Sequence, residues 1–100
     1  MVKDKKIVMF IGSCRFLKTM KEIAWEYTRA GWIVMLPNER PDTAADIDAE
    51  KLEAIGKSKI DIADLVFVCN VDGYIGNSTR VELNHALLNG KNIKYYKEIK

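Results

Sequence analysis

The sequence has little of what would indicate an extracellular, membrane or metal-binding protein. It contains only 2 cysteines and 1 histidine, and no group of His, Cys and acidic residues has the spacing of metal ligands. Cys14 and Cys69 cannot form a disulfide framework, and we interpret both as free thiols. No apolar stretch approaches the roughly 18 residues that a membrane span needs, and the first residues lack a signal-peptide pattern. We therefore expect a cytoplasmic protein with no metal ion.

A strong excess of charge is also missing. The formal net charge is +2, and acids and bases are well mixed, with extra lysines only toward the two ends. This is the pattern of a solvated surface, so we expect no nucleic-acid partner and no membrane partner. A chain of 100 residues, 48% of them hydrophobic, is long enough for one core and too short for two. We therefore expect a single domain over residues 1–100.

Three continuous apolar runs have the pattern of strands buried on both faces of a parallel sheet. They cover residues 7–11, 32–36 and 65–69. Pro37 closes the second run, because proline cannot donate a hydrogen bond within a sheet. A fourth strand is predicted over residues 92–96.

Amphipathic helices are predicted between these strands. Apolar residues recur with helical spacing from residue 16 to residue 30, and Gly31 supplies a natural end. A similar pattern over residues 81–89 predicts another helix, with Gly90 as its cap.

The helix expected between the second and third strands is less regular. Thr43, followed three residues later by Asp46, indicates a helix start. Gly56 has a low helix propensity, so the extent of this helix is left open. Its expected apolar stripe consists of Ile47, Leu52 and Ile55.

The alternation of strands and helices predicts the fold class. Parallel strands need crossovers of a dozen or more residues, and such crossovers are right-handed. We therefore expect an α/β protein with a small doubly wound, flavodoxin- or Rossmann-like parallel sheet of about four strands flanked by helices. Ligands of such sheets bind beyond the carboxyl ends of the strands, where the strand order reverses. The loops after the first and third strands should meet at that edge.

The loop after the first strand has the composition of an anion site. Gly12, Ser13 and Arg15 offer backbone N–H groups, a hydroxyl and a guanidinium at the start of a helix. A phosphate would suit this loop. A tight turn with Ser13 as the helix N-cap and Arg15 in solvent explains the same residues.

The loop after the third strand holds Glu82, which has two interpretations. Thr79 and Glu82 have the spacing of a capping box, in which each side chain satisfies a backbone N–H group of the other residue. Alternatively, the Glu82 carboxylate lies near the positive end of a helix, is held ionised and attacks an electrophilic carbon. The spacing alone leaves both interpretations open.

Other polar residues surround Glu82 in the sequence. Asp72 follows the third strand and could accept hydrogen bonds from a sugar or base, although an Asp-Gly turn also explains it. Tyr74 could stack on a base or cover the loop. His85 can share a helix face with Glu82 and handle protons, or it can simply pack. Asp61 and Asp64 flank the start of the third strand, at the opposite edge of the sheet, where turn or capping roles are expected.

Four short motifs together resemble a known superfamily. They are Gly12-Ser13-x-Arg15, Ile62-Ala63-Asp64, Asp72-Gly73 and Ser78-Thr79-x-x-Glu82-Leu83-x-x-Ala86. In this arrangement the chain resembles the nucleoside 2-deoxyribosyltransferase-like superfamily, which includes base-exchanging transferases and nucleoside 5′-monophosphate N-glycosidases. The resemblance covers nearly the whole chain. Asn84 and His85 differ from the residues common in the family, and residues 37–46 form a shorter segment than the family uses to enclose the base.

The resemblance implies cleavage or exchange of the N-glycosidic bond of a nucleoside or a (deoxy)nucleoside 5′-monophosphate. Glu82 would be the nucleophile that attacks the anomeric carbon, with no cofactor, and Asp72 would be a second catalytic residue. A homodimer or larger homo-oligomer is also implied. The alternative hypothesis is a non-catalytic module that binds a nucleotide or a ribose phosphate. The residues expected to bind the substrate are Gly12, Ser13, Arg15, Tyr74, Asn77, Ser78 and Thr79.

Overall fold

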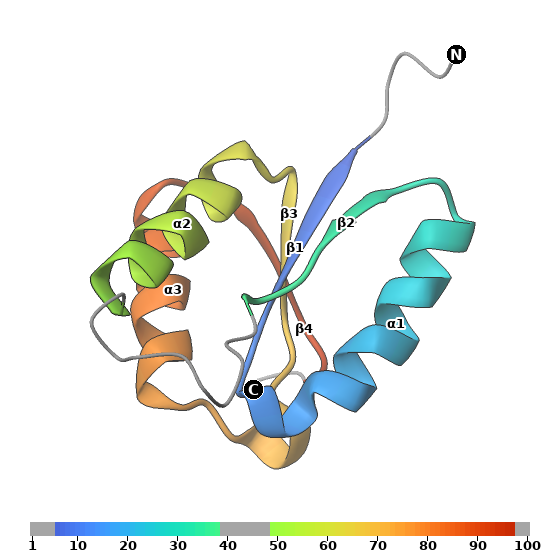
Figure 1. Cartoon of the computed structure of the whole chain (residues 1–100). Coiled ribbons are helices and arrows are strands. Elements are labelled where there is room, and N and C mark those ends of the chain that lie inside the picture. Colours follow the sequence, from blue (N-terminus) through green and yellow to red (C-terminus); the bar gives the residue numbers. More distant parts are fainter. Residues whose placement is uncertain (1–5, 39–48, 98–100) are drawn as a thin grey trace.

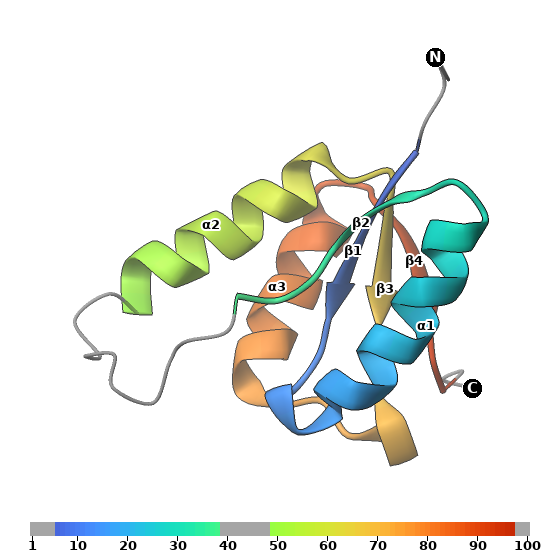
Figure 2. The same ribbon diagram turned by 45° about the vertical axis from the view of Figure 1, so that its right-hand side comes forward.

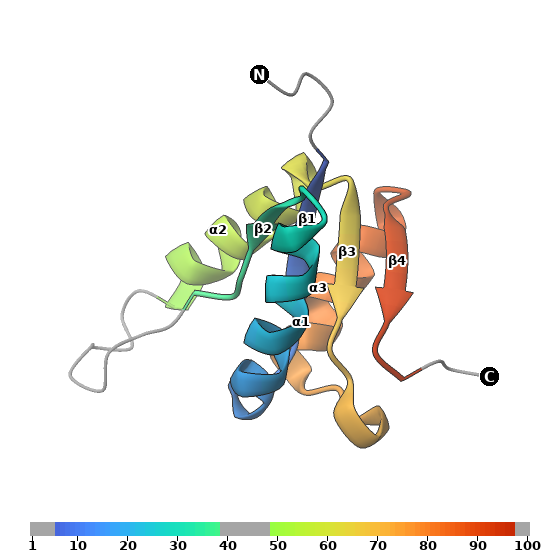
Figure 3. The ribbon, with the colours of Figure 1, turned by 90° about the vertical axis from the view of Figure 1, so that its right-hand side faces the viewer.

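The sheet confirms the predicted fold class. The computed structural model describes residues 6–38 and 49–97, and within them four parallel strands form one sheet in the order β2-β1-β3-β4 (Figure 3). The chain leaves the central strand β1 for β2 at one edge, returns to β3 on the other side of β1, and ends at β4. The strands are β1 (Ile7–Ile11), β2 (Ile33–Met35), β3 (Leu65–Val68) and β4 (Asn92–Tyr95).

Three helices of the described residues cover the two faces of the sheet. α1 lies on one face, whereas α2 and α3 lie side by side on the other (Figures 1 and 2). Two short 3-10 turns, η1 and η3, follow β1 and β3. This is the layering of a doubly wound fold, because the crossover after β2 passes to the opposite face. The bounds are η1 (Cys14–Phe16), α1 (Leu17–Arg29), α2 (Ala49–Ile62), η3 (Val71–Gly73) and α3 (Asn77–Leu88).

Successive residues of β1 supply the two halves of the core. Val8 and Phe10 face α1, and Met9 and Ile11 face α2 and α3, because side chains alternate along a strand. All four are at most 1% exposed. This two-sided burial explains why β1 is a continuous apolar run.

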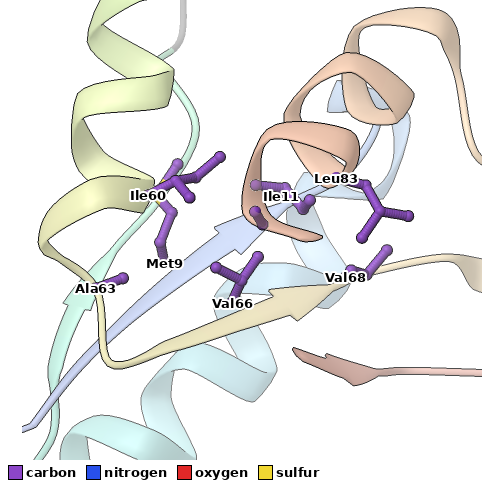
Figure 4. Close-up of a cluster of buried hydrophobic side chains, with 8 residues drawn as sticks. Met9, Ile11, Ile60, Ala63, Val66, Val68 and Leu83 are labelled. Carbon is purple, nitrogen blue, oxygen red and sulfur yellow. The ribbon is translucent and has the colours of Figure 1, made fainter. Parts of the chain in front are cut away.

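The core beneath α2 and α3 is aliphatic. Side chains from the two helices meet those of β1 and β3 in one cluster (Figure 4). Its buried members are Met9, Ile11, Ile60, Ala63, Val66, Val68, Leu83 and Ala86.

The core beneath α1 is largely aromatic. The Phe10 ring packs on the Phe67 ring, with centroids 4.9 Å apart, and edge-on against Tyr27 at 5.7 Å. Tyr27 in turn meets Trp32 edge-on at 5.3 Å. These contacts link α1 to β1, β3 and the entry of β2.

Two helices end as the sequence predicts. After α1, Gly31 has φ 97°, and its N–H and that of Trp32 donate to the carbonyls of Thr28 and Tyr27. After α3, Gly90 has φ 66°, with the same pattern of hydrogen bonds. Both are Schellman motifs, which require the left-handed conformation that glycine adopts without strain.

α2 differs from its predicted form. The expected helix start at Thr43 and Asp46, and Ile47 of the stripe, lie outside the described residues. Gly56 lies in the helix interior, and α2 continues through it. Ile55 is 48% exposed, so its place in the apolar stripe was wrong. The buried positions are instead Gly56 and Ile60, four residues apart.

Candidate functional site

A cleft of about 750 Å³ opens at the carboxyl edge of β1 and β3. This edge is where the strand order reverses, as the fold class predicts. Four segments that are distant in the sequence form the walls. They are Gly12–Cys14 after β1, Pro37–Asn38 after β2, three residues of α2 (Leu52, Glu53, Gly56), and the start of α3 (Gly76–Thr79, Val81, Glu82), with Met9 also lining the cleft.

The amino terminus of α3 contributes backbone donors to the cleft. Gly76 is the N-cap, and no side chain caps the helix. The first bond of the helix runs from the N–H of Arg80 to the Gly76 carbonyl, at 2.9 Å. The N–H groups of the first three helical residues, 77–79, therefore have no intrahelical acceptor. Together with the helix dipole, they make this end of the cleft suitable for an anion.

The capping-box interpretation of Thr79 and Glu82 was wrong. It requires Thr79 to be the N-cap, but α3 begins two residues earlier, after Gly76. Thr79 is instead a buried residue of the first turn, and Glu82 lies in the second turn. The carboxylate of Glu82 therefore does not cap the amino terminus of α3.

The loop after β1 combines a close backbone approach with a turn. A Cβ added at Gly12 would lie 3.0 Å from the Cys69 carbonyl oxygen, so only glycine fits without a shift where this loop passes the end of β3. The Arg15 N–H donates to the Ser13 hydroxyl at 3.3 Å, which caps η1. Ser13 thus has the predicted capping role and also lines the cleft.

Glu82 is partly buried between α3 and α2. Its Oε2 atom would lie 2.8 Å from a Cβ added at Gly56, so the carboxylate packs against the bare backbone of α2. Burial raises the pKa of Glu82, the nearby negative charge of Glu53 raises it further, and the positive charge of Lys59 lowers it. Within the described residues, no group donates a hydrogen bond to this carboxylate. Glu82 is therefore a desolvated carboxylate that faces open space.

Lys59 holds one wall of the cleft in place. Its ammonium group donates to the Leu36 carbonyl at 2.9 Å and to Asn38 Oδ1 at 2.7 Å. These bonds tie the chain after β2 to α2. Because an ammonium group only donates, the Asn38 atom that it contacts is the oxygen.

Three of the predicted site residues do not line this cleft. Arg15 lies over the ring of Tyr74, with the guanidinium carbon 4.2 Å from the ring centroid. Asp72 is exposed in η3, with φ 55°, and forms a turn with Gly73. The structure brings together Gly12, Ser13, Asn77, Ser78, Thr79 and Glu82.

The other polar residues that the sequence singled out lie away from the cleft. His85 Nε2 is 2.7 Å from Asp61 Oδ1, which joins α3 to α2. Asp64 Oδ2 accepts from the Ile7 N–H at 2.7 Å, at the amino edge of the sheet. Neither aspartate lines the cleft, but their contacts join distant elements and are not the turn or capping contacts that were expected.

Sequence patterns did not assign Asn38, Glu53 or Gly56 to the cleft. Glu53 and Gly56 lie on one face of α2, and Asn38 is bonded to Lys59, which does not itself line the cleft. The spacing of Glu53 and Gly56, three residues apart, places them on one helix face, and this was the available clue. Which face of α2 meets α3 was not evident from the sequence, because the assumed stripe included the exposed Ile55.

No protein-family model and no curated protein matches this chain. Within the described ranges, the helices also lack the combination of length and apolar character that a bilayer crossing requires.

Proposed function

We propose that this protein cleaves or exchanges the N-glycosidic bond of a nucleoside or a (deoxy)nucleoside 5′-monophosphate, with Glu82 as the nucleophile. The observation that carries the proposal is the pairing, in one cleft, of a desolvated carboxylate with the uncapped amino terminus of α3. The motif resemblance of Gly12-Ser13-x-Arg15 and Ser78-Thr79-x-x-Glu82 supports the same chemistry.

The spacing of these two features suits a sugar phosphate. Glu82 lies five residues after Asn77, which is about 7.5 Å along a helix. A phosphate held by the free N–H groups at residues 77–79 would leave the anomeric carbon of an attached pentose within reach of Glu82. Ser13, which also lines the cleft, offers a hydroxyl to the same phosphate.

The chemistry follows that of a retaining glycosidase. The transition state for loss of the base resembles an oxocarbenium ion, which a nearby carboxylate stabilises and then captures. A desolvated carboxylate is a stronger nucleophile than one solvated by water, and no hydrogen bond from a described residue has to be broken before attack. The glycosyl enzyme then reacts with water or with a second base.

Release of free base tests this proposal. The protein is incubated with a panel of nucleosides and their 5′-monophosphates, and free base is followed by chromatography. We expect release by the wild type, and a loss on the order of 10³-fold or more in Glu82→Gln. Glutamine has nearly the same shape and carries no charge, so the desolvated site should tolerate it. Glu50→Gln, which changes an exposed residue outside the cleft, is the matched control.

Cys14 supplies a separate measure of binding. Cys14 lines the cleft and is exposed. Cys69 is buried, and burial raises the pKa of the Cys69 thiol. Cys14 should therefore react first with a thiol reagent, and a bound nucleotide should slow that reaction. Protection of Cys14 without base release would favour the non-catalytic nucleotide-binding module. Neither protection nor release with any member of the panel would reject both functions.

The resemblance further implies a homo-oligomer. Val81 lines the cleft and is 42% exposed, so an apolar surface continues from the cleft toward solvent. A second copy of the chain would cover such a surface. Light scattering after size exclusion, with wild type and Val81→Lys, measures whether this surface holds two copies together.

A further inference from the structure

A second carboxylate shares the cleft with Glu82. Glu53 lines the cleft from α2, and its negative charge is close enough to raise the pKa of Glu82. Asp72, the second catalytic residue expected from the sequence, does not line the cleft. Of the carboxylates in the described residues, only Glu53 and Glu82 line it.

The geometry of α2 brings these two groups together. The Glu82 carboxylate packs against Gly56, and Glu53 lies three residues before Gly56, one turn away on the same helix face. Glycine at position 56 adds no side chain beside the Glu82 carboxylate. Two carboxylates from facing helices therefore border the same volume of the cleft.

The two carboxylates differ in their surroundings. Glu82 is desolvated against α2, whereas the Glu53 side chain is 52% exposed and its Oε1 atom lies 3.3 Å from the Lys57 ammonium group. This exposed ion pair adds little to stability, but it keeps the positive charge of Lys57 beside Glu53. Glu53 is thus a carboxylate with access both to water and to the space in front of Glu82.

We propose that Glu53 is the general base of the hydrolytic step, an inference that rests on the proposed function. In the first step, a Glu82 oxygen bonds to the anomeric carbon while the carbon–nitrogen bond breaks and its electron pair leaves with the base. In the second step, a water oxygen bonds to that carbon, Glu53 takes the water proton, and the carbon–oxygen bond to Glu82 breaks with its electron pair returning to the carboxylate. Glu53 then returns the proton through solvent to the base anion. One nucleotide and one water thus become a sugar phosphate and a neutral base.

The assignment predicts a specific defect in Glu53→Gln. The first step stays intact, so a rapid-quench assay with a substrate that wild type cleaves should show a burst of about one base per active site. Later turnovers should be slower by on the order of 10²–10⁴-fold, the usual contribution of a general base. Mass spectrometry of the quenched protein should detect the sugar phosphate on Glu82. Azide is an anionic nucleophile that needs no proton removed, so it should restore turnover in this variant.

The other results separate the inference from the proposed function. Steady-state turnover of Glu53→Gln at the wild-type rate, or an equal loss in the first and later turnovers with no azide rescue, overturns the role of Glu53 and leaves Glu82 as nucleophile. Absence of base release by the wild type overturns both. Glu50→Gln, one turn earlier on α2 and outside the cleft, should match the wild type throughout.

Discussion

Glu82 shows how one side chain can be costly to the fold and useful in the cleft. Its carboxylate lies against the backbone of Gly56, where burial favours the protonated form. The charges that face it come from α2, and they oppose each other, with Glu53 raising its pKa and Lys59 lowering it. Ionisation of Glu82 in the folded protein therefore costs stability.

This cost has a defined dependence on pH. The pKa of Glu82 in the folded state is raised above its ordinary value of 4.5. Well below pH 4.5 the Glu82 carboxyl is protonated in both the folded and the unfolded state, so it does not affect the free energy of unfolding. As the pH rises from this value to the raised pKa of the folded state, the unfolded state ionises first and is increasingly favoured. Wild type should thus lose stability relative to Glu82→Gln as the pH rises through this interval. Urea unfolding of both proteins on either side of it measures the difference, and a constant difference would contradict the prediction.

Only those residues of the cleft that belong to a recognisable local sequence pattern could be predicted. Gly12, Ser13 and Glu82 follow strand ends in recognisable spacing, and the structure brings them to one cleft. Arg15 and Tyr74 were chosen for their chemistry, yet they pack on each other outside it. Which way an exposed arginine or tyrosine turns depends on neighbours that are distant in the sequence, so no local pattern predicts it.

α2 positions the site through a residue that weakens the helix. Gly56 costs about 1 kcal/mol of helix propensity relative to alanine. Its missing Cβ is what allows the Glu82 carboxylate to lie against the helix, because a Cβ there would be 2.8 Å from Oε2. The low propensity at this position is therefore compensated by a role in the cleft rather than in the core.

Gly56→Ala should separate stability from function. Alanine raises helix propensity, and the atom that it would meet is the end of a flexible side chain, so Glu82 moves rather than the backbone. We expect unchanged or higher stability, by up to about 1 kcal/mol, together with slower base release. Thermal unfolding and the base-release assay measure the two effects.

Ser58→Ala supplies the control on the same helix. Ser58 is exposed and bonds only within α2, to the Ala54 carbonyl, so its replacement raises propensity without reaching Glu82. Gly56→Ala with full activity would show that the position of the carboxylate is not restricted by α2. A large loss of stability in Gly56→Ala would show that the backbone, not Glu82, gives way.

The strands and two of the helices were predictable because each depends on a local pattern. All four strands were predicted to within one residue at either end. Continuous apolar runs identified β1, β2 and β3, and burial on both faces accounts for this composition in β1 and β3, whereas β2 and β4 are partly exposed edge strands. The glycines after α1 and α3 identified the helix ends. The start of α3 was missed, because Gly76 caps it without a side-chain hydrogen bond and the Thr79–Glu82 spacing offered a false alternative.

The cleft gathers residues from both halves of the chain. Segments that begin at Gly12, Pro37, Leu52 and Gly76 each supply part of its wall. These segments come together only when β1, β2 and β3 are paired. A ligand that needs the complete cleft therefore binds only the folded chain and not the unfolded chain.

Binding should consequently raise the melting temperature. A ligand at 100 times its Kd adds about 2.7 kcal/mol to the free energy of unfolding, and each kcal/mol raises the melting temperature of a domain this small by about 4–8 °C. We expect a rise with a nucleoside 5′-monophosphate and a smaller one with the nucleoside that lacks the phosphate. Equal shifts with both would contradict a phosphate at the α3 amino terminus. Differential scanning fluorimetry measures both.

The parallel order of the sheet also sets the order in which the chain can fold. Among the described strands, none pairs with a neighbour joined to it by a hairpin, so each of these pairings must wait for a crossover to close. During synthesis β1 can pair with β3 only after residue 68 has been made, and until α3 follows, α2 alone covers the face of β1 that carries Met9 and Ile11. Fragments that end before α3 should therefore aggregate rather than fold, since they leave one apolar face of the sheet only partly covered.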